Sequence, residues 1–388
     1  MSMTRQSISR RGRESGRAFT VTELLVVISL IVVLVLLAVP SFSAMIASSE
    51  AAMAETQLRT AMRAARDAAV RSAGGSGAGD GAAVFFFEPG GRLSIVPCVK
   101  AGEIEDWADP TVQDDKDTVR REIFVAAPGY TPVVLPKYWS VRGFVPANAF
   151  SKFWYGGAYS QTTNPGGAPA RSWVFPETGF YDDTVVDDGA HRSTFMVRFQ
   201  GGTGALVGAS TEPVLVLAPR PSAQGRNASP FNNYRADKDA NQDPVGFVRR
   251  VLTMPPGTDG GQGVHYRRQL LGRLSSDLVM ARPVMQVGLY NEKKLANAAG
   301  ANLDTKTGSV YQPFQVGSPM AYLGAPNDPA PRITLSMSII SNYMEGDSNL
   351  DGSVVGPNGT NGPPDTPDAK LFSIDRTTGV LRQMEVQP

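Results

Sequence analysis

The chain has 388 residues, enough for two domains or for one large domain with an N-terminal extension. Its 37 basic and 36 acidic side chains nearly cancel, which excludes the strong positive field of many nucleic-acid-binding proteins, so we expect no nucleic-acid partner. The single cysteine, Cys98, excludes an internal disulfide and a cysteine zinc site, and we expect it to be a small core residue.

The N-terminus begins with a basic segment and continues into an aliphatic run. Residues 1–17 carry five arginines against one glutamate. From Ala18 to Ser49 the only charge is Glu23, and Leu24 to Val39 is almost entirely Leu, Val and Ile. This predicts a membrane-spanning helix over residues 19–40, with the N-terminus in the cytoplasm and the rest of the chain outside. A cleaved signal peptide is the alternative, but its apolar core is usually only about 7 to 15 residues.

Glu23 is unusual because a carboxylate within a membrane span costs roughly 2.5 to 3.5 kcal/mol on insertion scales. The stretch AFTVTELLVVISLIVVLVLLAVPSF resembles the N-terminus of type IV prepilins and type II secretion pseudopilins. With Phe19 as the first mature residue, Glu23 is fifth and Pro40 twenty-second, where that family has Glu and Pro. The resemblance implies that a prepilin peptidase cleaves between Ala18 and Phe19, after which Phe19 is N-methylated. Ala18 departs from the family, which normally has Gly there. An ordinary single-pass anchor with an accidental Glu is the alternative.

The resemblance also implies how the subunits assemble. Glu23 would pair with the new α-amino group at Phe19 of a neighbouring subunit, since Coulomb attraction is strong at low dielectric. This pairing would set the axial register of the subunits. Pro40 removes a backbone donor, so the helix is expected to bend or loosen there.

The segment after Pro40 is rich in Ala and long straight-chain residues, which favour helix. Small residues recur at steps of three and four, predicting one face that packs on a head domain; they are Ala47, Ala51, Ala54, Leu58, Ala61, Ala65 and Ala69. Gly74 and Gly75 supply the end, so we expect one helix over residues 19–73. The following GGSGAGDG leads from a helix to a strand, the reverse of a phosphate loop, and is read as a connector.

The stretch LRTAMRAARDAAVR, followed by VFFFEPGGRLSIV, resembles the H-type minor pseudopilins and the FimT-like minor pilins. From Ala82 onward, short apolar runs alternate with turn signals, which is typical of an antiparallel β domain. We expect a hairpin at 84–96, strands at 195–199, 214–218, 247–254 and 333–339, a short helix within 275–295, and a closing hairpin at Gly379. The expected fold class is therefore α+β and pilin-like. A leader (1–18) precedes the helix (19–73), which packs on a largely antiparallel β head with long loops (74–388).

The sequence offers no catalytic constellation, so we expect no enzyme activity. His191 and His265 lie far apart in sequence and match no catalytic motif, and we expect both to be surface or strand residues. Asp347, Asn349 and Asp351, followed by Gly, match the first half of a calcium loop. The twelfth position lacks the bidentate Glu, so a polar turn is the alternative to a calcium site. Asp237, Asp239, Asn241 and Asp243 form a weaker version of this pattern, which lacks the Gly.

The sequence therefore predicts a structural subunit, a minor pseudopilin or minor pilin of a type II secretion or type IV pilus machine. The implied partners are other pilin-like subunits, the prepilin peptidase and an inner-membrane assembly platform. The implied location is the bacterial inner membrane as a single-pass protein with a periplasmic head, and then a periplasmic or extracellular filament. Two alternatives remain: a tip adhesin or DNA-uptake pilin whose head binds a ligand, and a membrane-anchored ectodomain enzyme.

Overall fold

The part of the chain that the computed structural model describes includes the helices α1 and α3, twelve strands, and further helical residues at 292, 294–295 and 343–345. That part comprises residues 20–72, 79–88, 92–107, 118–146, 172–176, 193–208, 213–219, 244–253, 276–292, 294–295, 343–345 and 369–384. The helices are α1 (Val21–Ser72) and α3 (Pro244–Thr253). The strands are β1 (Gly81–Glu88), β2 (Arg92–Trp107), β3 (Thr118–Ala126), β4 (Val133–Val134), β5 (Trp139–Val145), β6 (Ser172–Val174), β7 (Ser193–Phe199), β8 (Val214–Pro219), β9 (Ser276–Pro283), β10 (Gln286–Asn291), β11 (Lys370–Ile374) and β12 (Leu381–Gln383).

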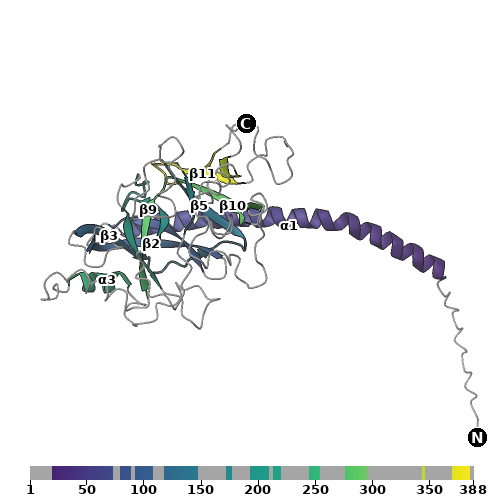
Figure 1. The fold of residues 1–388 in the computed structure, drawn as a ribbon, viewed down its shortest axis with the longest axis horizontal. Helices are drawn as coiled ribbons and strands as arrows, with labels where there is room; N and C mark the ends of the chain where they lie inside the picture. Colours follow the sequence, from purple (N-terminus) through teal and green to yellow (C-terminus); the bar gives the residue numbers. More distant parts are fainter. Residues whose placement is uncertain are drawn as a thin grey trace, which may run out of the picture. The chain divides into compact units, whose positions relative to one another are not determined.

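The first sheet closes on itself. Its strand order is β1-β7-β9-β8-β3-β2, and β1 pairs again with β2, while β4 attaches to the side of β2. Two of the ladders, β3–β8 and β7–β9, are parallel, and the other ladders are antiparallel. In Figure 1 the strands β2, β3 and β9 of this sheet lie close together.

Both faces of β1 and β7 in the closed sheet are buried, so these strands carry apolar residues at successive positions rather than alternately. All six ring strands contribute to one apolar cluster in its interior: Ala82, Val84, Phe86, Val96, Cys98, Phe124, Met196, Val214, Val216, Val279 and Ala281. The neighbouring residues of β1, such as Phe85, point to the other face and join the main core. Cys98 is buried in the interior cluster, and burial raises the pKa of its thiol. The expectation of a core cysteine is confirmed.

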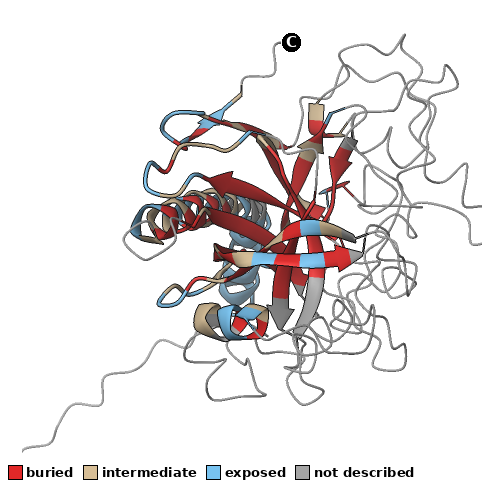
Figure 2. Cartoon of the chain, turned by 90° about the vertical axis from the view of Figure 1, so that its left-hand side faces the viewer, coloured by how far each residue is buried: buried red, intermediate tan, exposed pale blue. Residues whose placement is uncertain are grey.

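The second sheet has the order β12-β11-β10-β5-β6 and is antiparallel throughout. Phe195 of β7 lies directly under Gly143 of β5, where an added Cβ would stand 2.8 Å from the Phe195 ring. The ring of Phe195 also stacks on that of Phe85, with a centroid distance of 4.5 Å. The aromatic side chains of the closed sheet therefore fill the space beneath the second sheet, and Figure 2 shows buried residues along both sheets.

The chain divides into two compact units, Met1–Ala52 and Met53–Pro388. In the second unit, α1 packs on the sheets through a face of small residues: Ala54, Leu58, Ala61, Ala65 and Ala69, all fully buried. The face approaches β1 so closely that a Cβ on Gly81 would lie 2.6 Å from the Cβ of Ala69 and 2.7 Å from the Ala65 carbonyl oxygen. The residues from Ala54 onward form the face that the sequence predicts, whereas Ala47 in the first unit is exposed.

Polar contacts also hold α1 against the strands within the second unit. Glu55 bonds Arg59 one turn along the helix and Lys370 of β11, the latter at 2.7 Å. Arg59 also donates to the Leu381 carbonyl oxygen at 2.9 Å and lies over the Phe372 ring. These contacts attach the C-terminal hairpin to the helix. The hairpin turns at Gly379, whose φ is 64°, as the sequence predicts.

The predicted fold class is wrong in how the head is built. The sequence predicts a largely antiparallel head, whereas β1, β2, β3, β7, β8 and β9 form a closed sheet with two parallel ladders. The parallel ladders bring together strands that are distant in the chain. Local patterns of apolar residues and turns cannot reveal such pairings, because they report only neighbours in sequence.

One local prediction in the head is also wrong, and another covers too much. The run at 247–254, predicted as a strand, lies almost wholly in helix α3, whose Val248 and Val251 face inward while Arg249 and Arg250 are exposed. The region 275–295, predicted to hold a short helix, is mostly β9 and β10, and its described helical residues are confined to Glu292, Lys294 and Leu295 at its end. Short apolar runs fit either structure, and tertiary packing decides between them. The predicted strand at 333–339 lies outside the described residues.

No helix in the described part of the chain is long and apolar enough to cross a membrane. This finding contradicts the membrane span predicted over residues 19–40. It equally contradicts the predicted location as a single-pass inner-membrane protein with a periplasmic head, and the description of the chain as a transmembrane pilin. Hydropathy alone misled here because a helix that is apolar all round is typical of burial among protein segments as well as of burial in lipid.

Candidate functional site

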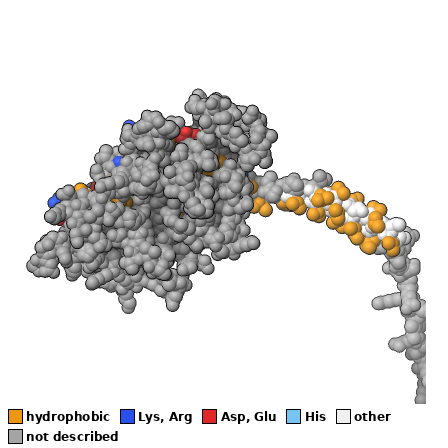
Figure 3. All heavy atoms as spheres, viewed as in Figure 1, with side chains coloured by type: hydrophobic (Ala, Val, Ile, Leu, Met, Phe, Trp, Pro, Cys, Tyr) orange, Lys and Arg blue, Asp and Glu red, His pale blue; other side chains and the backbone are white. Residues whose placement is uncertain are grey.

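The first half of α1 is the largest exposed apolar surface among the described residues. Seventeen large apolar side chains between Val21 and Ile46 are at least half exposed. They include seven consecutive positions, from Leu30 to Leu36, so they surround the helix instead of forming one stripe. Figure 3 shows these side chains in orange along α1. Soluble surfaces rarely expose a contiguous apolar patch of this size unless it binds something.

Glu23 lies at the start of α1 and forms a capping box with Thr20. The Glu23 carboxylate accepts hydrogen bonds from the Thr20 backbone N–H and from the Thr20 hydroxyl, both at 2.9 Å. The Glu23 backbone N–H in turn donates to the Thr20 hydroxyl oxygen at 3.3 Å. The two bonds from Thr20, the backbone one first, lower the pKa of Glu23. A Thr and a Glu three positions apart thus satisfy donors that a helix start leaves unpaired, so Glu23 has a local role that the sequence reasoning missed.

The other predicted processing and assembly residues are only partly described. Ala18 and Phe19 lie outside the described residues. Pro40 lies within α1, which continues from Val21 to Ser72 without a break. Its ring removes one donor from the helix ladder, but this does not end the helix.

The predicted calcium residues Asp347, Asn349 and Asp351 lie outside the described residues, as do the four residues of the weaker pattern at 237–243. His191 and His265 lie outside them too. Within the ranges that are described, no group of three or more His, Cys, Asp or Glu side chains is arranged to hold a metal ion.

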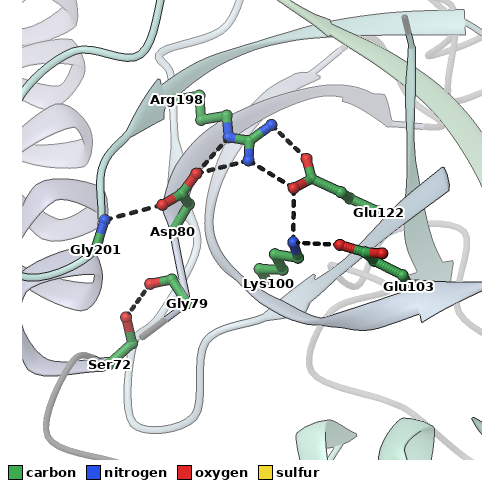
Figure 4. A network of polar contacts seen from close by, with 8 residues as sticks. All are labelled: Ser72, Gly79, Asp80, Lys100, Glu103, Glu122, Arg198 and Gly201. Carbon is green, nitrogen blue, oxygen red and sulfur yellow. Dashed lines mark hydrogen bonds and ion pairs between the residues drawn. The ribbon is translucent and has the colours of Figure 1, made fainter. Parts of the chain in front are cut away.

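A cluster of charged side chains lies beside the interior of the closed sheet, near the end of α1. Arg198 of β7 bonds Asp80 at 2.6 Å and also pairs with Glu122 of β3. Lys100 of β2 bonds Glu122 at 2.7 Å and Glu103 at 3.0 Å. We call these five residues the Arg198 ion cluster (Figure 4). Successive side chains of a strand point to opposite faces of the sheet, so Arg198, Lys100 and Glu122 are on the same face as the interior apolar residues. Arg198 also lies over the Phe124 ring.

The Arg198 ion cluster joins the end of α1 to the sheet. Asp80 accepts a hydrogen bond from the Gly201 backbone N–H at 3.0 Å, and the next residue, Gly202, donates to the Ala69 carbonyl oxygen of α1 at 3.2 Å. Arg66 of α1 donates to the Gly204 carbonyl oxygen at 3.2 Å. The cluster therefore orients the turn that binds the last turns of the helix. Each charge in it has an opposite partner, as expected of a structural ion network.

Acidification should weaken the Arg198 ion cluster. Burial alone would raise the pKa of Glu122, but hydrogen bonds from Arg198 and Lys100, with their positive charges, hold that pKa below its ordinary 4.5. A lowered native pKa contributes stability that is present above pH 4.5 and is lost as the pH falls through the native value. We therefore expect the difference in unfolding free energy between wild type and Glu122→Gln to be largest above pH 4.5 and to shrink below it. Denaturant titrations at a series of pH values measure this difference.

Glu103→Gln is the matched control for that experiment. Glu103 bonds the same Lys100 but is half exposed, so its removal should change stability by at most about 0.5 kcal/mol at any pH. Equal pH dependence of the two variants would contradict the role assigned to Glu122.

A second polar cluster lies in the second sheet around a completely buried arginine. Arg142 of β5 donates to the Tyr290 hydroxyl at 3.0 Å and to the Trp173 carbonyl oxygen at 3.2 Å. The Tyr290 hydroxyl donates to Glu292, and the Trp173 indole N–H donates to Glu345 at 2.8 Å. Arg142, Tyr290 and Glu292 are each at most 1% exposed. This arrangement lets the phenol bridge a guanidinium and a carboxylate, which holds β5, β6 and β10 in register.

Sequence reasoning named neither of these clusters. Arg142 and Arg198 each lie within an apolar strand sequence, WSVRGFV and STFMVRF. An arginine in such a run could have indicated a buried charge that needs a partner. Their partners could not be named, because Asp80 and Glu122 are distant from Arg198 in the chain and the pairing depends on the closed sheet.

The chain was compared with protein-family models, curated proteins and solved structures, and none of the three comparisons gave a match.

Proposed function

We propose that the chain is a structural subunit that assembles through α1 into a filament with other subunits carrying such a helix. One observation carries the proposal: the first half of α1 exposes aliphatic side chains on every side. A helix that packs on one partner needs only one apolar stripe, so an apolar surface all round fits a helix enclosed by several others.

The energetics favour a stable assembly. At the low end of about 1.5 kcal/mol for each large side chain removed from water, burying these seventeen residues is worth on the order of 25 kcal/mol before the cost of association. The uncharged surface from Leu24 to Ser49 places no like charges between neighbouring helices.

The N-terminal sequence supports the same role. The order of Phe19, Glu23 and Pro40 is the one that, in prepilins and pseudopilins, accompanies cleavage by a prepilin peptidase and assembly as a minor subunit. We therefore include cleavage between Ala18 and Phe19 in the proposal. N-terminal sequencing of the protein purified from cells with and without a prepilin peptidase tests this step, and a first residue other than Phe19 would contradict it.

A charge placed within the aliphatic surface should prevent assembly. In Ile31→Glu the new carboxylate would be enclosed by the neighbouring helices, so we expect co-purification of two differently tagged full-length copies to fall at least about tenfold. Val380→Glu is the control, because Val380 is an equally exposed aliphatic residue in the C-terminal hairpin (50%, against 53% for Ile31). Unchanged co-purification of Ile31→Glu would contradict the proposed function.

A further inference from the structure

The second half of α1 and the C-terminal hairpin carry a group of arginines within the second unit. Arg59, Arg63 and Arg66 belong to α1, and Arg376 and Arg382 belong to the hairpin. We call these five residues the arginine surface. At 100° per residue the three helix arginines fall within an arc of about 60°, so they share one side of α1. Arg63, Arg376 and Arg382 are exposed, and the Arg382 side chain keeps 69% of its accessible surface.

One contact between the helix and the hairpin lies at Arg59. Its guanidinium donates to the carbonyl oxygen of Leu381 at 2.9 Å, and Arg382 is the next residue along the hairpin. Lys370, at the start of β11, bonds Glu55 of the helix at 2.7 Å. Strand β12 therefore runs beside the side of α1 that carries the arginines.

A second contact lies one to two turns further along α1. Arg66 donates to the Gly204 carbonyl oxygen at 3.2 Å, and a Cβ added to Gly379 at the hairpin turn would lie 3.2 Å from the same oxygen. The Leu206 backbone N–H donates to the Arg376 carbonyl oxygen at 2.9 Å. The hairpin turn and the helix arginines thus meet on the same short segment, which makes the arginine surface continuous.

The arginine surface has an excess of positive charge. In the described part of the chain it comprises six basic side chains when Lys370 is included, against the two carboxylates of Glu55 and Asp375, an excess of four. Arg63 and Arg376 form no ion pair with a carboxylate of the described residues, because the nearest acid along the helix, Asp67, pairs with Arg71 instead. These two guanidinium groups are therefore available to an anion from outside.

Carboxylates are the anions that the arginine surface already binds. Arg59 donates to Glu55 through two nitrogens, at 3.0 and 2.9 Å, and Arg382 bonds Asp375 at 2.7 Å. A guanidinium presents five N–H donors in a planar fork that matches a carboxylate, so the exposed arginines can repeat this bond with a second chain.

Exposed aliphatic side chains lie among the arginines and favour a protein segment over a phosphate polymer. Val380, 50% exposed, precedes Leu381 and Arg382 in the hairpin. Val70, 42% exposed, lies beside Gly204, where an added Cβ would stand 3.1 Å from its methyl group. A peptide that combines carboxylates with apolar side chains can cover both kinds of residue, whereas a chain of phosphates offers little to the aliphatic ones.

We propose that the arginine surface binds an acidic segment of a partner protein, in which Asp or Glu side chains alternate with apolar ones. The inference goes beyond the proposed function, because assembly is assigned to the first half of α1, which contributes no residue to this surface. The whole chain has a net charge of only +1, so the attraction is local and acts over short distances.

Titration of the full-length protein into a fluorescein-labelled peptide of Glu and Leu, followed by fluorescence anisotropy, tests the inference. We expect Arg63→Glu and Arg376→Glu each to weaken binding at least about fivefold, because each replaces an attraction by a repulsion. Val380→Glu should weaken it at least about threefold, although that variant is expected to leave co-purification of two copies unchanged. Raising the ionic strength from about 0.01 M to about 1 M should weaken binding by the wild type, because the Debye length falls from about 30 Å to about 3 Å.

Arg250→Glu is the matched control, because Arg250 is an exposed arginine of α3 outside the surface and its reversal changes the net charge equally. The same peptide with Gln in place of Glu is the control probe. The inference is wrong if Arg63→Glu and Arg376→Glu bind like Arg250→Glu, or if the Gln peptide binds as tightly as the Glu peptide. It is also wrong if inorganic polyphosphate binds more tightly than the peptide and loses its binding in these two variants, since the surface then takes phosphates. None of these outcomes alters the proposed function, which co-purification tests separately.

Discussion

Glu23→Gln should reduce assembly of full-length copies by about tenfold or more while leaving helix α1 intact. Gln keeps the side-chain oxygen that accepts hydrogen bonds from Thr20, so the capping box is retained. What Gln lacks is the negative charge. If that charge pairs with the α-amino group of a neighbouring Phe19 within an apolar surrounding, its removal leaves the amine without a partner. Co-purification of differently tagged copies measures assembly, and circular dichroism measures the helix.

Two variants separate the capping role of Glu23 from the pairing role. Thr20→Ala removes the hydroxyl of the capping box and keeps the charge, so we expect a slightly frayed helix start with nearly normal assembly. Glu50→Gln removes the other carboxylate of the apolar part of α1 and should change neither property. If Glu23→Gln assembles normally while Thr20→Ala does not, Glu23 acts only as a cap.

Gly81→Val should destabilise the fold by about 3 kcal/mol, the upper range for overpacking of a close contact. The first added carbon would already lie 2.6 Å from the Cβ of Ala69 and 2.7 Å from backbone atoms of Ala65 and Ala69. Since helix backbone cannot move aside as a long side chain can, α1 and β1 must separate. Denaturant unfolding followed by tryptophan fluorescence, to which the buried Trp173 contributes, measures the change.

Gly208→Ala is the matched control for Gly81→Val. An added Cβ at Gly208 meets no atom within 4 Å, and the residue does not have a positive φ, so we expect a change within about 0.5 kcal/mol. Equal stability of Gly81→Val and wild type would show that α1 does not approach β1 as closely as described.

Local patterns in the sequence predicted the elements whose partners are near in the chain. The small-residue face from Ala54 to Ala69 and the hairpin of β1 and β2, with Val84 opposite Val96, follow directly from spacing and turn residues. The closed sheet could not be predicted in this way, because the pairing of β9 with β7 and β8 leaves no trace in the local pattern of apolar and turn residues. Residues 247–253 show the same limit of local patterns. Their apolar spacing is compatible with a strand, but in the structure they form a helix that packs against β2.

Those features of the candidate site that depend on the sequence of α1 alone could be predicted. The aliphatic surface of α1 and the position of Glu23 can be read from the sequence, but the bond between Thr20 and Glu23 and the exposure all round the helix required the structure. The membrane span was wrong for a related reason, because hydropathy measures how apolar a segment is and does not identify what covers it.

The position of β9 has a consequence for how the chain folds during synthesis. β9 fills the gap between β7 and β8, although it is the last of the three to emerge from the ribosome. Until residues 276–283 are available, β7 and β8 of the nascent chain have unpaired edges, which are templates for pairing with other chains. A chain that stops before Ser276 should therefore aggregate instead of forming a smaller stable domain, and ring closure across such long sequence separations should make folding slow.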